Sequence, residues 1–165
     1  MKRTAILSFC LALSSAVAAH AQPTMIKKFD DWGVYSYSRE GRTVCYLLTV
    51  PKTAQPAGVD HGRNFFVIGK APGKLTAYEP QAIMGYDLKP GSRGQIQIGD
   101  RTFAMFAKGK SAWVLEESKE SDVIEAMRSG SDMTIAVVSN RGTQTSYTYS
   151  LSGVTAALKQ MSQCK

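Results

Sequence analysis

The stretch QIQIGDRTFAMFAKGKSAWVL, residues 95–115, decides the fold class of this 165-residue chain. Residues 95–98 and 101–107 carry alternating side chains and are separated by Gly99-Asp100, a spacing typical of a β-hairpin. A second turn at 108–110 leads the chain into residues 111–115. The pattern therefore predicts an antiparallel meander.

Period-two alternation continues on both sides of this meander and indicates half-buried strands. Residues 32–37 and 44–50 predict a hairpin around Glu40-Gly41, and 65–68 read as a short buried strand. Residues 133–138 and 146–151 predict another hairpin. About eight short strands separated by turns favour a mainly β domain, either an antiparallel β-sandwich or a strongly curved sheet.

Two helices are expected beside the strands. The first covers about 121–129, because Asp122 lies in its first turn and Gly130 follows its end. The second is C-terminal, near 154–163. Its apolar stripe consists of Val154, Ala157, Leu158 and Met161. Cys164 continues that stripe, which directs its sulfur toward the sheet.

Residues 1–21 have the organisation of a cleavable signal peptide. Two basic residues precede an apolar run over 5–18, and small residues at 19 and 21 predict cleavage between Ala21 and Gln22. The alternative is a membrane anchor, but the run is shorter than the roughly 20 residues that span a bilayer. We therefore expect a mature β domain over 22–165, without a transmembrane segment, in the periplasm, associated with the outer membrane or secreted.

The charge of the mature chain is mildly positive. Cleavage leaves 18 basic residues against 13 acidic ones, a net charge of +5. The basic residues are scattered, which predicts no nucleic-acid partner and is consistent with a charge that only favours solubility. The alternative is attraction to an anionic partner such as an acidic glycan.

Cleavage would also remove one of three cysteines and leave Cys45 and Cys164. An oxidising compartment favours joining such a pair, so one structural disulfide is predicted. The alternative is a reactive thiol pair, which usually has the spacing Cys-x-x-Cys or lies beside a histidine.

The mature chain offers little for catalysis. His61 is its single histidine, so no zinc site, cofactor or catalytic residue is predicted. His61 itself is either a surface turn residue or a pH-sensitive or catalytic group. No nucleophile elbow, dinucleotide fingerprint or complete phosphate-binding loop occurs.

Two groups of side chains are candidates for binding. Arg101, Lys108, Lys110 and Trp113 could form a basic-aromatic patch, although turn lysines and a core tryptophan explain the same residues. The second group is made of tyrosines, which either form a binding face or pair across strands. These are Tyr35, Tyr37, Tyr147 and Tyr149.

Three stretches carry a family resemblance: FDDWGV at 29–34, TVCY at 43–46 and YSLSGVTAAL at 149–158. With them the chain resembles the invasion associated locus B family of exported bacterial proteins. The resemblance implies a β-rich envelope or secreted protein, linked in some pathogens with entry into host cells and without established enzymatic activity. Many members have a cysteine where this chain has Ser36, so the family's disulfide pattern cannot be copied.

We therefore expect an exported, non-enzymatic envelope or surface protein. Its partner would be another envelope or host protein, or an anionic glycan, and host invasion is one use of such binding. The oligomeric state is left open. The alternative is a small periplasmic hydrolase or enzyme inhibitor acting on cell-wall or host material, which a deep pocket lined by paired carboxylates or by His61 would favour.

Overall fold

The computed structural model describes residues 22–71, 73 and 78–164. The predicted signal segment, with Ala21 of its cleavage site, lies outside these residues. Within them, eleven strands form one antiparallel sheet, accompanied by two α-helices and a short 3-10 helix. The strands are β1 (Thr24–Phe29), β2 (Trp32–Arg39), β3 (Arg42–Thr49), β4 (Thr53–Gln55), β5 (Phe65–Lys70), β6 (Tyr78–Ile83), β7 (Arg93–Ile98), β8 (Arg101–Lys108), β9 (Ser111–Val114), β10 (Asp132–Val138) and β11 (Gln144–Ser150). The helices are η1 (Glu117–Lys119), α1 (Glu120–Ser129) and α2 (Val154–Ser162).

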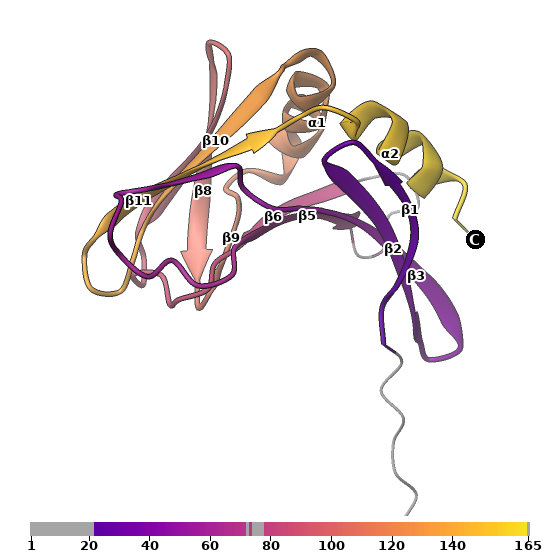
Figure 1. Ribbon diagram of the computed structural model, residues 1–165, viewed down its shortest axis with the longest axis horizontal. Coiled ribbons are helices and arrows are strands. Elements are labelled where there is room, and N and C mark those ends of the chain that lie inside the picture. The colour runs from indigo at the N-terminus through magenta and orange to yellow at the C-terminus, as the bar shows by residue number, and fades with distance from the viewer. Residues whose placement is uncertain (1–21, 72, 74–77, 165) are drawn as a thin grey trace, which may run out of the picture.

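The sheet is open and strongly curved. Figure 1 shows this curvature. The strand order is β1-β2-β3-β5-β6-β9-β8-β7-β10-β11-β4, so β1 and β4 are the edges. The curvature brings β11 over β5, where Phe66 contacts Trp32 and Tyr149 at ring-centroid distances of 6.3 and 6.0 Å. The Trp32 indole Nε1 donates a hydrogen bond to the Ser150 carbonyl at 3.0 Å. Of the two predicted architectures, the strongly curved sheet is confirmed.

All eight predicted strands are present, and their hairpins have the expected turns. In the β2–β3 hairpin, Glu40 and Gly41 have φ values of 53° and 74°, the left-handed conformation that a tight two-residue turn requires. The prediction missed β1, β4 and β6. Strand β1 is an almost fully exposed edge and shows no apolar alternation, β4 has three residues, and β6 contains Pro80. Pro80 is tolerated because it lies just beyond the part of β6 that pairs with β9.

The two α-helices agree with their predicted positions and pack on the same side of the sheet (Figure 1). All four residues of the predicted α2 stripe are buried, against β1, β2 and β3. Cys164 follows the helix and forms the predicted disulfide with Cys45 of β3, with the two Cα atoms 6.4 Å apart. Helix α2 begins after Gly153, whose φ is +90° and where a Cβ atom would lie 2.1 Å from the Phe29 carbonyl oxygen. Only glycine fits this turn.

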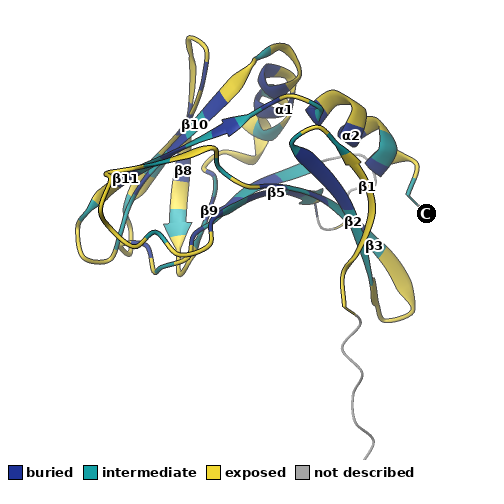
Figure 2. Ribbon diagram, in the orientation of Figure 1, coloured by how far each residue is buried: buried dark blue, intermediate teal, exposed yellow. Residues whose placement is uncertain are grey.

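The core lies on the inner face of the sheet, between the curved strands and the helices (Figure 2). It consists almost entirely of apolar side chains, with Trp32, Phe66, Tyr147 and Tyr149 among the largest that are fully buried. Among the described residues, the Tyr149 hydroxyl has no hydrogen-bond partner. Burial raises the pKa of this phenol. The sheet thus buries one face, and its opposite face is available for contacts outside the domain.

Candidate functional site

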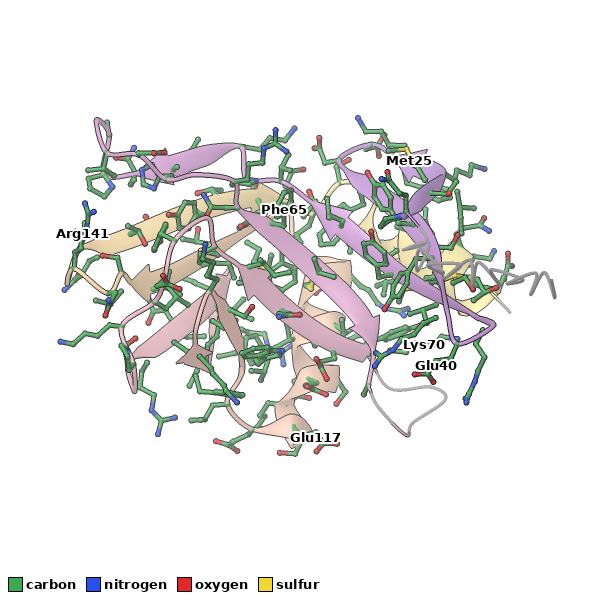
Figure 3. The ribbon with its side chains drawn as sticks, turned by 90° about the horizontal axis from the view of Figure 1, so that it is seen from below. Met25, Glu40, Phe65, Lys70, Glu117 and Arg141 are labelled. Atoms are coloured by element: carbon green, nitrogen blue, oxygen red, sulfur yellow. A yellow bond between two sulfur atoms is a disulfide. The ribbon has the colours of Figure 1, made fainter. Side chains whose placement is uncertain are left out.

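The first candidate site is the outer face of the sheet, opposite the helices. Strand register places one row of side chains across five neighbouring strands, from Leu48 on β3 to Val67, Gln81, Trp113 and finally Phe106 on β8. Figure 3 looks onto this side of β5, with Phe65 and Lys70 at the two ends of the strand. No described helix or strand lies in front of it in that view.

The apolar residues of this surface are only partly buried. We call them the outer face: Tyr35, Tyr37, Val44, Tyr46, Leu48, Phe65, Val67, Ile83, Phe106 and Trp113. Phe106 is 39% exposed, and all the others are intermediate. In an antiparallel sheet with one covered face, the other face usually carries polar side chains. A contiguous apolar patch on that face indicates an interaction surface.

Aromatic pairs hold the outer face in a fixed shape. Tyr46 stacks on Tyr35 with ring centroids 5.5 Å apart, and Tyr37 meets it edge-on at 6.0 Å. Phe106 stacks on Trp113 at 5.4 Å. Such cross-strand pairs stabilise the sheet and leave the ring edges available for contact. The cross-strand pairing considered from the sequence is therefore observed, and it leaves the same rings partly exposed.

The other half of the outer surface has a different character. On β7, β10, β11 and β4, the residues at outward positions are mostly small or uncharged. They include Gln95, Gln97, Thr134, Ala136, Gln144, Ser146, Thr148, Thr53 and Gln55, whereas Arg93 and Asp132 are the charged residues at strand ends. Tyr147 and Tyr149 of β11 point inward and are fully buried, so they cannot belong to a binding face.

The structure divides the predicted basic-aromatic patch. Lys108 and Trp113 line one hollow of about 440 Å³ on the outer face. Arg101 is at the opposite end of β8, where its guanidinium lies 5.1 Å from the centroid of the Phe103 ring. Lys110 lines a different cleft. A binding role for the four residues stays a prediction, but they do not form one patch.

The second candidate site is that cleft, a polar depression of about 530 Å³. Four connecting segments form it: the β4–β5 loop, the β6–β7 loop, the β8–β9 turn and the β10–β11 turn. Figure 3 shows Arg141 of the last turn at the end of the molecule away from α2. The charged and titratable residues in its lining are Asp60, His61, Tyr86, Asp87, Lys110 and Arg141.

The buried side chain of Asn64 holds the loop that carries His61 in place. The buried Asn64 side chain donates through Nδ2 to the His61 carbonyl at 3.0 Å and accepts a hydrogen bond from the Gly85 amide at 3.0 Å. Gly85 packs so closely that a Cβ atom there would lie 2.7 Å from the Gly62 Cα. These contacts place the imidazole at the edge of the cleft, beside β11.

Both ring nitrogens of His61 have a partner. Nε2 lies 3.0 Å from the Pro56 carbonyl oxygen, and Nδ1 lies 2.8 Å from the Tyr147 hydroxyl. Burial, followed by the hydrogen bond with Tyr86, raises the pKa of the Tyr147 phenol, so this hydroxyl keeps its hydrogen at neutral pH. In this arrangement both ring nitrogens contact groups of the protein itself, and the hydroxyl beside Nδ1 belongs to a fully buried tyrosine.

Sequence reasoning recognised His61 but missed the residues that hold it. Tyr86 bonds both the Tyr147 hydroxyl, at 2.8 Å, and the Thr145 hydroxyl, at 2.6 Å. Thr145 was detectable in principle, because it is a polar residue at an inward position of β11. Tyr86 carried no signal, since the β6–β7 loop shows no periodicity. Within the described ranges, no three His, Cys, Asp or Glu side chains cluster as metal ligands.

Together these features define a small disulfide-linked β domain with one open, curved antiparallel sheet and a helix that packs the C-terminus onto it. The chain belongs to the invasion associated locus B (IalB) protein family, whose model matches residues 32–162. The fold is similar to that of invasion associated protein B from Bartonella henselae, with a TM-score of 0.59 and 12% identity. That match covers 82% of this chain and 92% of the other. No curated protein matches the sequence. None of the described helices has the length and apolar character to cross a membrane.

Proposed function

We propose that this chain is an exported envelope or surface protein that binds another protein through its outer face. The single observation that carries the proposal is the outer face, a group of ten partly exposed apolar side chains on β2, β3, β5, β6, β9 and β8, with Gln81 in the middle of its central row. The core of a protein interface is apolar and depleted of charge, and aromatic residues are enriched there. The outer face has this composition, including three tyrosines and one tryptophan.

The charges around the outer face support a protein partner over an anionic glycan. Exposed Arg39 and Arg42 flank the tyrosines, whereas Glu79 and Lys108 line the hollow beside Trp113. Both signs of charge at the edge of an apolar centre fit the polar rim of a protein interface. An anionic glycan would instead require basic residues along the whole face. Here Arg39 and Arg42 lie together only at the tyrosine end, and Glu79 accompanies Lys108 beside Trp113. In a bacterium that enters host cells, a host surface protein is one such partner.

Site-specific photo-crosslinking in living cells tests this proposal. A photoreactive phenylalanine analogue at Tyr46 or Trp113 should yield the same protein adduct, identified by mass spectrometry. The same analogue at Thr148, on the half of the outer surface formed by β7, β10, β11 and β4, is the matched control and should yield none. Identical adducts at all three positions, a glycan adduct, or no adduct would contradict the proposal. Fractionation of the same cells tests export, with Gln22 expected at the N-terminus of the exported protein.

A hydrolase is the second candidate, because His61, Asp60 and Asp87 line the same polar cleft. Against it, the hydroxyl that His61 contacts through Nδ1 belongs to Tyr147, which is fully buried and therefore out of reach of a substrate. If the cleft were catalytic, His61→Gln would abolish turnover of peptidoglycan fragments or peptides by the purified protein. We expect no turnover by the wild type, and unchanged crosslinking from Trp113 in the His61→Gln variant.

A further inference from the structure

Gly69 is a glycine inside strand β5, on the same side of the sheet as the outer face. It is paired with Glu79 of β6 and follows Val67 by two residues. Figure 3 labels the next residue, Lys70, at one end of the strand. No described atom lies within 4 Å of the position that a Cβ atom would occupy at Gly69, and its φ is outside the left-handed region. A turn or a tight contact within the described domain therefore does not explain this glycine.

The other two glycines within described strands have reasons inside the domain. A Cβ atom at Gly33 of β2 would lie 2.5 Å from the ring of Tyr35, so this ring occupies the space that the missing side chain leaves. A Cβ atom at Gly94 of β7 would lie 3.0 Å from the Ala136 carbonyl oxygen. Glycine weakens a strand, and within a strand it often marks the close approach of another backbone or a ligand. At Gly69 the space for such an approach is open.

A second residue without an internal reason lies beside this space. Gln81 is at the centre of the row that crosses the outer face, between Val67 and Trp113. Its side-chain amide makes no hydrogen bond with any described residue, and it is partly exposed, so water satisfies it in the free protein. A partner that covers the apolar row displaces this water. An amide left unpaired in the interface opposes binding, so the partner has to supply a donor and an acceptor.

Gly69 and Gln81 are close enough to meet the same segment of a partner. Gln81 is directly opposite Val67, which makes it the diagonal neighbour of Gly69. Diagonal neighbours in an antiparallel sheet are about 7–8 Å apart, which is about the length of two residues of an extended chain. A peptide group offers the N–H and C=O that match a side-chain amide. A side chain at position 69 would hold such a backbone away from the sheet.

We propose that the partner of the outer face lays an extended segment of its main chain across Gly69 and pairs one of its peptide groups with the Gln81 amide. This inference rests on the proposed function and names the chemistry of the partner protein. The apolar side chains supply the contact area. Gln81 opposes the binding of any apolar surface that lacks a matching donor and acceptor, which makes it the specificity-determining residue of the outer face.

Gly69→Val separates this role from a structural one. The new side chain meets open space and valine favours a strand, so the Tm of the variant should equal or exceed that of the wild type. Photo-crosslinking in living cells, from the analogue at Tyr46 and at equal levels of exported chain, should yield about tenfold less protein adduct, as a steric cost in the interface predicts. Ala136→Val, at an outward position of β10, is the matched control and should leave the adduct yield unchanged.

Gln81→Met tests the hydrogen bonds, because methionine keeps the length of the side chain and removes its donor and acceptor. The adduct yield from Tyr46 should again fall about tenfold. A yield that equals or exceeds that of the wild type would overturn the proposal, because it would mean that the amide is unpaired in the complex. A lower Tm of Gly69→Val would also overturn it, by showing that the domain itself requires the space at this glycine.

The same experiment distinguishes failure of this inference from failure of the proposed function. If the otherwise wild-type chain with the analogue at Tyr46 gives no protein adduct, the proposed function fails and this inference fails with it. If that chain gives an adduct and Gly69→Val and Gln81→Met give as much, the outer face binds a partner but does not use Gly69 and Gln81 in the way proposed.

Discussion

Removing the Cys45–Cys164 disulfide is the sharpest test of what holds this domain together. The two cysteines are 119 residues apart, so the bond closes a loop that contains almost all of the sheet. In the chain-entropy model, a cross-link over a loop of this length contributes about 5 kcal/mol to the free energy of unfolding. For a domain of this size, the same amount corresponds to a loss of roughly 15–20 °C in Tm. We therefore expect Cys45→Ala with Cys164→Ala to be strongly destabilised.

The double variant should nevertheless keep its C-terminal helix in place. Four residues of α2 are almost completely buried against the rest of the domain: Val154, Ala157, Leu158 and Met161. Full burial of an aliphatic or methionine side chain contributes about 1.5–3 kcal/mol, so these contacts alone can dock the helix. The disulfide then acts mainly on the unfolded chain. Far-ultraviolet circular dichroism of the variant should match that of the wild type at low temperature.

Urea unfolding of the oxidised wild type, the reduced wild type and the double variant provides the measurement. The reduced wild type is the control, because it keeps both sulfur atoms and loses only the covalent bond. It should lose nearly as much free energy of unfolding as the variant, and mass spectrometry without reductant should show Cys45 joined to Cys164 in the exported protein. A loss below about 1 kcal/mol in both samples would refute the reasoning. A large loss in the variant but not in the reduced protein would assign the effect to packing instead.

Three further predictions concern single residues. Gly153→Ala should lower the free energy of unfolding by about 2 kcal/mol or more, since its methyl group would overlap the backbone of β1. The control is Gly109→Ala, whose methyl group meets no atom and which should cost less. Urea titrations of the two variants measure the difference. At pH 7, Tyr147→Phe should cost about 1–3 kcal/mol for two lost hydrogen bonds, and Tyr149→Phe should be neutral or slightly stabilising; a reversed order in Tm would contradict this account. The hydrogen bond from Lys52 is the main cause of the lowered pKa of Asp31. The stability that this carboxylate contributes should therefore be present at neutral pH and lost as the pH falls through its folded pKa. Asp31→Asn should remove this pH dependence when Tm is measured across an acid titration.

Local patterns in the sequence predict much of the secondary structure. The hairpin at Gly99-Asp100, the turn at Glu40-Gly41 and the α2 stripe all rest on residues close together in the chain. The alternation along β3 also shows that Cys45 shares a face with Leu47, and both are buried. The sequence did not predict the edge strand β1, because its side chains are nearly all exposed and show no apolar alternation.

The candidate sites, in contrast, are formed by residues that lie far apart in the sequence. Val67 lies beside Gln81, and Gln81 beside Trp113, only because β5, β6 and β9 are neighbours in the sheet. Arg101 and Lys108 are close in sequence, yet they stand at opposite ends of one strand. Spacing along the chain therefore suggested a patch that the extended backbone separates, and it gave no sign of the row that forms the outer face.

The sequence by itself determined eight of the eleven described strands, which residues of those strands share a face, and that two cysteines were available to pair. Tertiary structure alone decided the order of the strands, and with it the outer face and the meeting of His61 with Tyr147, 86 residues away. The physical reason is that a period of two reports the burial of a strand but not its neighbour. The neighbours of each strand in the sheet are set by long-range pairing and by the curvature that closes the core.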